Sequence, residues 1–284
     1  PYSNHQAKLF ATQLTLRQPA NSIDKLSHAI ASARVDLNPH QVDAALFAVR
    51  SPLSKGVILA DEVGLGKTIE AGIVISQKWA ERKRKLLIIA PATLRKQWQQ
   101  ELMDKFSIPS TILENATYKQ LKKEGKLASG DTLLICSYNF AANKADVLED
   151  IAWDLVVIDE AHRLRNVYKT GNKMAAAIAE VVADVPKLLL TATPLQNSLL
   201  ELYGLVSIID PHVFGDITSF KEQYVRGVNE ALRNSRLKER IKPFCQRTLR
   251  KQVLEYIKFT QRVAMTEEFV PSDDEHRLYE QVSA

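Results

Sequence analysis

The sequence predicts an α/β protein built on a doubly wound parallel sheet with helices on both faces. Short apolar runs recur through the middle of the chain, and they are nearly continuous rather than alternating. Such runs are typical of strands buried on both faces of a parallel sheet. Helical stretches separate the runs, and this alternation favours parallel strands joined by right-handed crossovers. The order of the strands does not follow from these patterns.

The elements can be justified in order along the chain. The expected strands are the apolar runs at 57–60, 86–90, 132–136, 155–159 and 187–191, with a weaker strand at 110–113. The expected helices lie between and after them, at 67–80, 93–106, 143–151, 172–183 and 199–209. The last helix ends at Asp210, because a residue that precedes proline disfavours helical backbone.

The character of the chain changes after residue 211. Residues 218–258 contain no convincing strand and resemble charged helices, broken at Lys242 and Pro243. We expect one more strand at 263–269 and the start of a helix at 273–284. Residues 1–36 are expected to form helical segments outside the sheet. We interpret the chain as a piece of a longer protein.

Composition excludes several classes of protein. The chain has 284 residues, 45% hydrophobic and 25% charged, which is ordinary for a globular protein. No apolar run reaches the roughly 18 residues that a membrane helix needs, and no signal peptide is visible at the N-terminus. The two cysteines, Cys136 and Cys245, lie far apart, which argues against a disulfide scaffold or a zinc site and fits a reducing compartment.

The charge is unevenly distributed. Net charge is +5, yet residues 221–262 alone carry twelve Lys or Arg against four Glu. A basic block on a near-neutral body favours a polyanion such as nucleic acid as partner. Charge alone leaves the alternative open that this block is the solvated face of exposed helices.

The first chemical motif runs from Val57 to Thr68, where a buried strand leads through a glycine turn into a helix. Such a turn directs backbone N–H groups and a positive helix end at one point, which suits a phosphate. Lys67 would reach the β- and γ-phosphates, and the Thr68 hydroxyl would ligate Mg²⁺. The general phosphate-loop pattern needs glycine where this chain has Asp61. The alternative, a glycine turn beside a surface lysine, is disfavoured by the strand–turn–helix order.

Two further motifs follow later strands. Asp159 and Glu160 end the run at 155–159, where Asp159 can face Mg²⁺ and Glu160 can orient and deprotonate the attacking water. His162, beside this pair, is expected to be functional rather than part of the core. The hydroxyls of Thr191 and Thr193 could hydrogen-bond to the carboxylate pair and couple the state of that pair to other parts of the protein. Carboxylates also cap helices, and the threonines fit a plain turn, so each motif has a structural alternative.

Together these motifs resemble the first RecA-like lobe of a Snf2-family ATPase in helicase superfamily 2. The loop at 61–68 has that family's form, which explains the missing first glycine. The similarity extends to 37–41, 91–101 and 135–138, and its most specific parts are 159–166 and 191–202. Alanine between Thr191 and Thr193, where many eukaryotic remodellers have glycine, favours a bacterial or archaeal branch that includes RapA-like and phage-defence-associated members.

The resemblance implies a role for each matched residue. Gln41 would contact adenine, and the loop would bind the nucleotide through Asp61, Glu62, Val63, Gly64, Leu65, Gly66, Lys67 and Thr68. Catalysis would rest on Lys67, Asp159 and Glu160, metal binding on Thr68 and Asp159, and coupling on His162, Thr191 and Thr193. Residues in or beside segments that face nucleic acid or the interlobe cleft are Arg95, Trp98, Ser137 and Arg163. On a helix, Trp98 is also compatible with a place in the core.

The implied domains are an N-terminal helical extension (1–36), the RecA-like ATP-binding lobe (37–211), a basic helical protrusion (212–262) and the start of a connection to a second lobe (263–284). The expected function is an ATP-dependent translocase on double-stranded DNA, sequence-independent, with ATP and Mg²⁺ as cofactors. It would work in the cytoplasm beside the nucleoid, or in the nucleus of a eukaryote. The second lobe of such enzymes supplies an arginine finger, so this chain alone should bind nucleotide weakly and turn over very slowly. The alternatives are a DEAH-type RNA or DNA helicase lobe and a non-catalytic interaction module.

Overall fold

The computed structural model describes Leu26, Ile30 and residues 33–50, 55–226, 230–257 and 271–283. These residues belong to two compact units, Pro1–Val253 and Leu254–Ala284, and each is described by itself. The first unit contains the sheet. In the second unit, α13 (Asp273–Ser283) confirms the helix expected at 273–284. The strand expected at 263–269 and most of the expected N-terminal helices lie outside the described residues.

A seven-stranded sheet runs through the first unit in the order β3-β4-β2-β5-β6-β1-β7. All of its neighbouring strands are parallel. The strands are β1 (Gly56–Leu59), β2 (Leu86–Ala90), β3 (Ser110–Ile112), β4 (Leu133–Ser137), β5 (Leu155–Asp159), β6 (Lys187–Leu190) and β7 (Cys245–Gln246). Every residue of β1, β2, β5 and β6 is buried, which explains why their sequences are continuous apolar runs. The predicted α/β class is confirmed.

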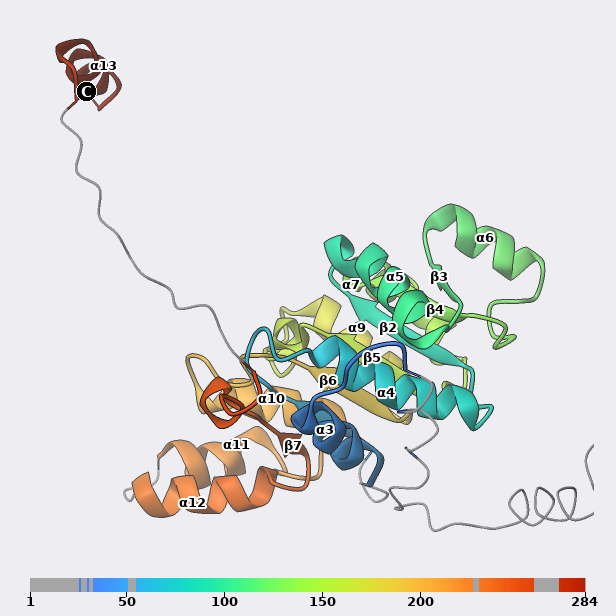
Figure 1. The fold of residues 1–284 in the computed structure, drawn as a ribbon. Helices are drawn as coiled ribbons and strands as arrows, with labels where there is room; N and C mark the ends of the chain where they lie inside the picture. Colours follow the sequence, from blue (N-terminus) through green and yellow to red (C-terminus); the bar gives the residue numbers. More distant parts are fainter. Residues whose placement is uncertain are drawn as a thin grey trace, which may run out of the picture. The chain divides into compact units, whose positions relative to one another are not determined.

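Helices cover both faces of the sheet (Figure 1). One layer consists of α3 (Pro39–Arg50), α4 (Lys67–Ala80) and α5 (Arg95–Phe106). The other consists of α7 (Tyr138–Asn143), α8 (Ala145–Glu149), α9 (Lys173–Val181) and α10 (Leu199–Ile209). Alternate strand residues serve the two layers, so that Leu59 packs into the first core and Ile58 into the second. A further helix, α6 (Asn115–Lys123), connects β3 to β4.

The expected boundaries differ from the structure in two helices. The helix expected at 143–151 is divided into α7 and α8, and α7 begins earlier because the Ser137 hydroxyl caps it by accepting the Phe140 N–H. The helix expected from residue 93 begins with a 3₁₀ turn, Ala92–Leu94, before α5. The other expected strands and helices from 57 to 209 lie within two residues of their limits, whereas α6 was not expected.

After α10 the chain packs on the body and then returns to the sheet. Phe220 of α11 (Ile217–Phe220) lies among Tyr203, Phe214 and Tyr224, with ring centroids 5.0, 4.9 and 5.1 Å away. A π-helical turn (Lys221–Val225) and α12 (Glu230–Ile241) follow, and β7 then pairs with β1. The prediction that residues 218–258 hold no strand is therefore wrong. A strand of two residues is too short to show any periodicity.

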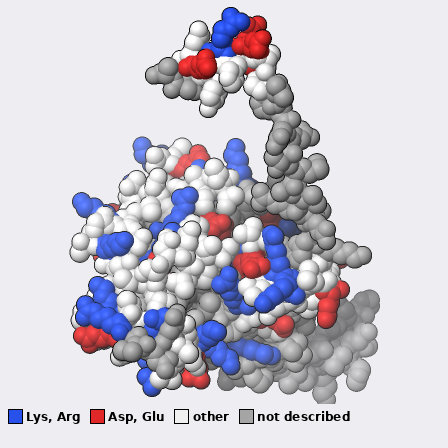
Figure 2. Space-filling view, turned by 90° about the vertical axis from the view of Figure 1, so that its left-hand side faces the viewer, with Lys and Arg blue, Asp and Glu red and all other residues white. Residues whose placement is uncertain are grey.

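On one face of the molecule the charges of both signs are interspersed. Figure 2 shows the side of the molecule on which α12 lies in Figure 1, and there Lys and Arg are interspersed with Asp and Glu rather than gathered in one continuous patch. Within the described residues, no helix combines the length and apolar character needed to cross a membrane.

Candidate nucleotide-binding site

The phosphate-binding loop, residues 60–66, connects β1 to α4. Gly64 and Gly66 have φ angles of 86° and 89°, in the left-handed region that glycine adopts freely. A Cβ atom on Gly66 would lie only 2.4 Å from Gln41 Nε2, so a side chain has no room there. Gly66 is also the N-cap of α4, and its carbonyl accepts from the N–H groups of Ile69 and Glu70. The loop therefore ends at a helix N-terminus, which favours negative charge.

Lys67 and Thr68 are the first two residues of α4 and line the cleft beside the loop. Lys67 Nζ donates to the Asp61 carbonyl at 2.8 Å and to the Glu62 carbonyl at 3.4 Å. The ammonium group thus lies at the same point as the helix N-terminus. Both features attract phosphate oxygens.

Gln41 supports the loop from α3. Its side chain is 3% exposed. Its Oε1 accepts from the Asn38 N–H at 3.0 Å, and its Nε2 donates to the Leu65 carbonyl at 3.0 Å. His40 Nε2 contacts the same carbonyl at 2.8 Å. These bonds tie α3 to the phosphate-binding loop, whereas the adenine contact expected for Gln41 stays a prediction.

Asp159 ends β5 at the carboxyl edge of the sheet and is 8% exposed. Its Oδ2 accepts from Trp98 Nε1 at 2.8 Å, and its Oδ1 accepts from the Glu160 N–H at 2.8 Å. The Tyr138 hydroxyl donates to its carbonyl. Burial raises the pKa of Asp159, while the Trp98 hydrogen bond acts in the opposite direction. The carboxylate is therefore fixed in one orientation.

Trp98 corrects one expectation. Its ring is 2% exposed and packs in the core between α5 and the sheet. A ring buried in this way offers no face to a nucleic acid, so the expected nucleic-acid contact of Trp98 is wrong. Its indole N–H instead holds the carboxylate of the second motif, a link that no spacing in the sequence indicates.

Glu160 extends into the cleft beside Asp159. Its φ is 52°, in the left-handed region that is uncommon for residues other than glycine. Glu160 Oε2 lies 3.1 Å from His162 Nδ1, and both side chains are about one-third exposed, at 37% and 32%. Glu160 is thus partly solvated and lies beside an imidazole.

One cleft of about 410 Å³ brings the expected groups together. Lys67 and Thr68 from α4 line it together with Asp159, the last residue of β5, and Glu160, which follows it. The two motifs meet because β1 and β5 flank β6 in the sheet, and parallel strands end at the same edge. Other residues that line the cleft are Val63, Gly64, Gly66, Ile69, Leu94, Gln97, Trp98, Glu101 and Lys105.

A buried pair of carboxyl groups, Asp61 and Glu70, lies behind the loop. Both residues are 0% exposed, and an oxygen of each lies within 4.8 Å of a His40 ring nitrogen. Asp61 Oδ1 accepts from the Thr248 N–H at 2.6 Å. Asp61 Oδ2 and both Glu70 oxygens have no partner among the described residues except each other. Burial first, and then Asp61, raise the pKa of Glu70 to about 9, so Glu70 keeps its proton near neutral pH.

The third motif is connected to the second by a different route from the one expected. Thr191 is buried, and its Oγ1 accepts from the Thr193 N–H at 3.2 Å. Among the described residues, no hydrogen bond joins either threonine to Asp159 or Glu160. Arg165 instead donates to Gln196 Oε1 at 2.9 Å and lies 3.6 Å from Glu201 Oε2. Glu201 also accepts the N–H groups of Gln196 and Asn197, so one buried carboxylate of α10 holds the loop.

The other residues expected near nucleic acid have local partners. Arg95 Nε donates to the Ala92 carbonyl, and its guanidinium lies 3.5 Å from Glu114. Ser137 caps α7, and the Arg163 guanidinium lies 5.5 Å from the centroid of the Tyr138 ring. Their contacts with nucleic acid stay predictions.

Comparison with known proteins gives a consistent result. The chain matches the family described as the SNF2-related domain over residues 14–284. It is 34% identical over 250 residues to the RNA polymerase-associated protein RapA of Serratia proteamaculans, covering 81% of this chain and 26% of that protein. It is 34% identical over 249 residues to the uncharacterized ATP-dependent helicase YqhH of Bacillus subtilis, covering 86% of this chain and 42% of that protein.

Two solved structures are similar in fold. The Sulfolobus solfataricus SWI2/SNF2 ATPase core in complex with dsDNA matches with a TM-score of 0.65 and 24% identity, covering 77% of this chain and 45% of that one. The Sulfolobus solfataricus SWI2/SNF2 ATPase core domain matches with a TM-score of 0.62 and 24% identity. The chain therefore spans between about a quarter and a half of the length of the proteins it matches.

Proposed function

Because this chain belongs to the SNF2-related family of ATPase domains, we propose that it is the ATP-binding first lobe of an ATP-dependent translocase on double-stranded DNA. The observation that carries this proposal is the meeting of Lys67, Thr68, Asp159 and Glu160 in one cleft. A lysine and a hydroxyl at a helix N-terminus, facing two carboxylates, are the groups that phosphoryl transfer needs.

The residues of the cleft divide the work. Lys67 and the N-terminus of α4 attract the phosphates, and their charge favours the transition state over the ground state. Glu160 orients the attacking water and accepts its proton, which its partial exposure and its neighbour His162 allow. Trp98 keeps the Asp159 carboxylate in the orientation that it needs.

The cleft also fits Mg²⁺, a hard cation that prefers oxygen ligands. The Thr68 hydroxyl and the Asp159 carboxylate both line it. Each Asp159 oxygen accepts one hydrogen bond from a neighbouring N–H, which leaves a second lone pair for a ligand. When bound, Mg²⁺ would neutralise charge on the transferred phosphoryl group.

Three observations support DNA as the partner. RapA is described as associated with RNA polymerase, the similar Sulfolobus core was solved with dsDNA, and residues 221–262 of this chain are strongly basic. Contacts to phosphates carry no sequence information, so binding should be salt-sensitive and independent of sequence.

The test is ATP hydrolysis by the full parent protein with no nucleic acid, duplex DNA, single-stranded DNA or RNA. Glu160→Gln removes the proposed base and serves as the blank. We expect stimulation mainly by duplex DNA, and at least about a hundredfold loss of hydrolysis in Glu160→Gln. Stimulation mainly by RNA or single strands would favour a DEAH-type helicase instead. Unchanged hydrolysis in Glu160→Gln would contradict the proposed site.

A further inference from the structure

The segment Phe244–Arg250, here called the outer strap, runs along β1 and continues beside the phosphate-binding loop. Its first half extends the sheet. Phe244 and Gln246 carbonyls accept from the N–H groups of Ile58 and Ala60, at 2.6 and 2.8 Å. The Thr248 carbonyl then accepts from the Glu62 N–H at 3.1 Å. The ladder thus passes beyond β1 into the loop itself.

The second half of the outer strap holds three consecutive loop residues. The Thr248 N–H donates to Asp61 Oδ1 at 2.6 Å, and the Arg250 N–H donates to Glu62 Oε2 at 2.8 Å. The Arg250 guanidinium donates to the Val63 carbonyl twice, from Nη2 at 2.7 Å and from Nε at 3.1 Å. These partners are separated by 187 or 188 residues in the sequence.

Arg250 acts on the loop from outside the cleft. It is absent from the described residues that line the cleft, whereas Val63 and Gly64 are among them. Lys67 holds the carbonyls of Asp61 and Glu62, and Arg250 holds the next carbonyl, that of Val63. The carbonyls of residues 61–63 are therefore all engaged by cations.

The direction of the Val63 carbonyl determines the direction of the Gly64 N–H. The two groups belong to one planar peptide unit, and in a trans peptide they point to opposite sides. The described chain has no cis peptide bond. Because Arg250 bonds the carbonyl and does not line the cleft, the N–H of this peptide is directed to the side of the loop opposite Arg250. Gly64, with a φ of 86°, has the freedom to flip that a larger residue lacks.

We propose that Arg250 is a positioning residue for nucleotide binding, which holds the Val63–Gly64 peptide so that the Gly64 N–H is presented to phosphate. This inference rests on the proposed function, because it concerns how the same cleft recognises ATP. Arg250 itself does not touch the nucleotide. It contributes by fixing the Gly64 N–H before the nucleotide binds, so that ordering this donor costs no conformational entropy on binding.

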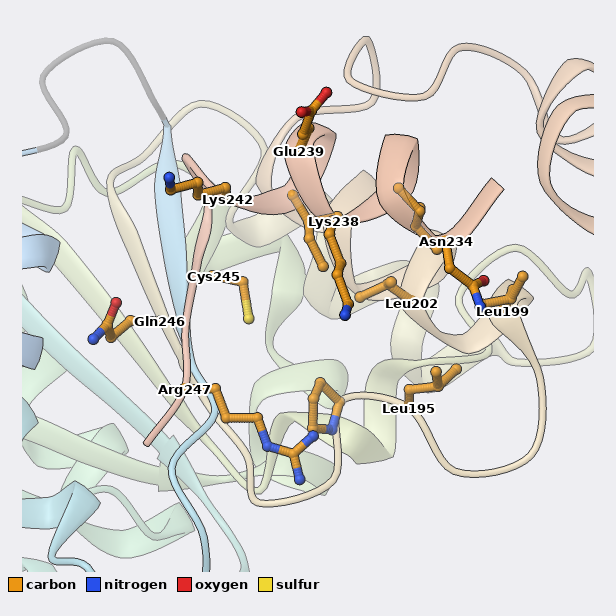
Figure 3. A pocket seen from close by; sticks show the side chains of 13 residues that line it. Leu195, Leu199, Leu202, Asn234, Lys238, Glu239, Lys242, Cys245, Gln246 and Arg247 are labelled. Carbon is orange, nitrogen blue, oxygen red and sulfur yellow. The ribbon is translucent and has the colours of Figure 1, made fainter. Parts of the chain in front are cut away.

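The outer strap also has a second face. Cys245 and Arg247 point away from the loop into a groove of about 720 Å³, whose opposite wall includes Leu195 of the third motif and Leu199 of α10 (Figure 3). Only Lys242 and Pro243 lie between the strap and the end of α12 that lines the same groove. The segment that orients the phosphate-binding loop is thus continuous with the basic helix.

The experiment measures the affinity of this chain for a fluorescent ATP analogue with Mg²⁺, at low and at high salt. Arg250→Ala should weaken binding about tenfold, since it removes two charge-assisted hydrogen bonds. Arg250→Lys can restore one donor to the Val63 carbonyl and should recover part of the loss. The melting temperature should stay within a few degrees of wild type, because Arg250 is exposed and contributes little to the core.

Lys251→Ala is the matched control, because it removes one positive charge from the adjacent exposed residue. We expect it to bind the analogue as wild type does. An equal loss in both variants, or a loss that disappears at high salt, would show a general charge effect and overturn the positioning role. Wild-type affinity in Arg250→Ala would overturn it as well. Failure of the wild-type chain to bind the analogue would overturn the proposed function together with this inference.

Discussion

At the scale of single residues, the sequence predicts which groups meet in the cleft but not what holds them. Lys67, Thr68, Asp159 and Glu160 carry recognisable spacing because each follows a strand. Trp98 does not, since its bond to Asp159 depends on how α5 packs against β5. The sequence contains one indication of the buried carboxyl pair, because Glu70 lies among the apolar residues of α4. A charged residue in such a place needs either a partner or a proton.

The buried pair of Asp61 and Glu70 predicts a pH-dependent stability. The pKa of Glu70 is about 9 when folded and near its ordinary value of 4.5 when unfolded. Below pH 4.5 both states hold the proton, and between 4.5 and 9 only the folded state does. Unfolding then releases a proton, so this residue makes the protein less stable as pH rises. Asp61 opposes ionisation of Glu70 and Lys67 favours it.

Glu70→Gln should remove this dependence. A glutamine is neutral at every pH, and its amide can donate to Asp61 Oδ2 as the protonated acid does. We expect the free energy of unfolding of the variant to exceed that of wild type at pH 8.5 by on the order of a few kcal/mol, so that it melts at a higher temperature. The two stabilities should converge towards pH 5. Thermal melts across this range provide the measurement. Glu70→Ala leaves a cavity and an unpaired Asp61, so it should be less stable than wild type at every pH. If the stabilities of Glu70→Gln and wild type changed with pH in parallel, the proton assigned to Glu70 would be contradicted.

At the scale of elements, prediction succeeded where burial on both faces leaves a long apolar run. The strands β2 and β5 and the helices α4 and α10 begin and end where the sequence indicates. The strand β7 could not be found, because its two residues lie within a charged segment and are fixed by β1 rather than by their own propensity. The helices α3 and α6 were also missed. The resemblance covered only the first turn of α3, residues 39–41, and gave it no helical limits. The helix α6 is mostly polar, with Tyr118 as its buried residue.

The position of α12 beside the groove predicts how charge affects DNA binding. Lys238 and Lys242 are exposed and line the groove. If these lysines contact phosphates, replacing both with Gln should reduce the slope of log K against log salt by up to about 2, since each contact contributes about 0.9. Fluorescence anisotropy with a labelled duplex at several salt concentrations measures that slope. Lys119 and Lys123 on α6 are equally exposed, and the same replacement there is the matched control. Equal changes in both variants would mean that net charge, not the position of α12, governs binding.

At the scale of the whole molecule, the cleft combines the groups that we propose bind ATP and activate water, but no arginine is among the described residues that line it. The cations among those residues are Lys67 and Lys105. An arginine finger contributes about 10³ to 10⁵ in rate where enzymes of this chemistry use one. The chain also spans between about a quarter and a half of the length of its relatives. We therefore propose that fast turnover needs residues from a second lobe.

A comparison of two proteins distinguishes an effect on ATP binding from an effect on ATP hydrolysis. The 284-residue chain and a two-lobed parent protein are assayed for binding of an ATP analogue and for ATP hydrolysis with duplex DNA. If the second lobe supplies the missing charge, hydrolysis by the chain should be lower by at least about a thousandfold, whereas binding should weaken far less because Lys67 and the helix N-terminus stay in place. Glu160→Gln in both proteins gives the background rate. Comparable hydrolysis by the chain and the parent would show that the cleft is complete by itself, and that Lys67 or Lys105 already neutralises the transition-state charge.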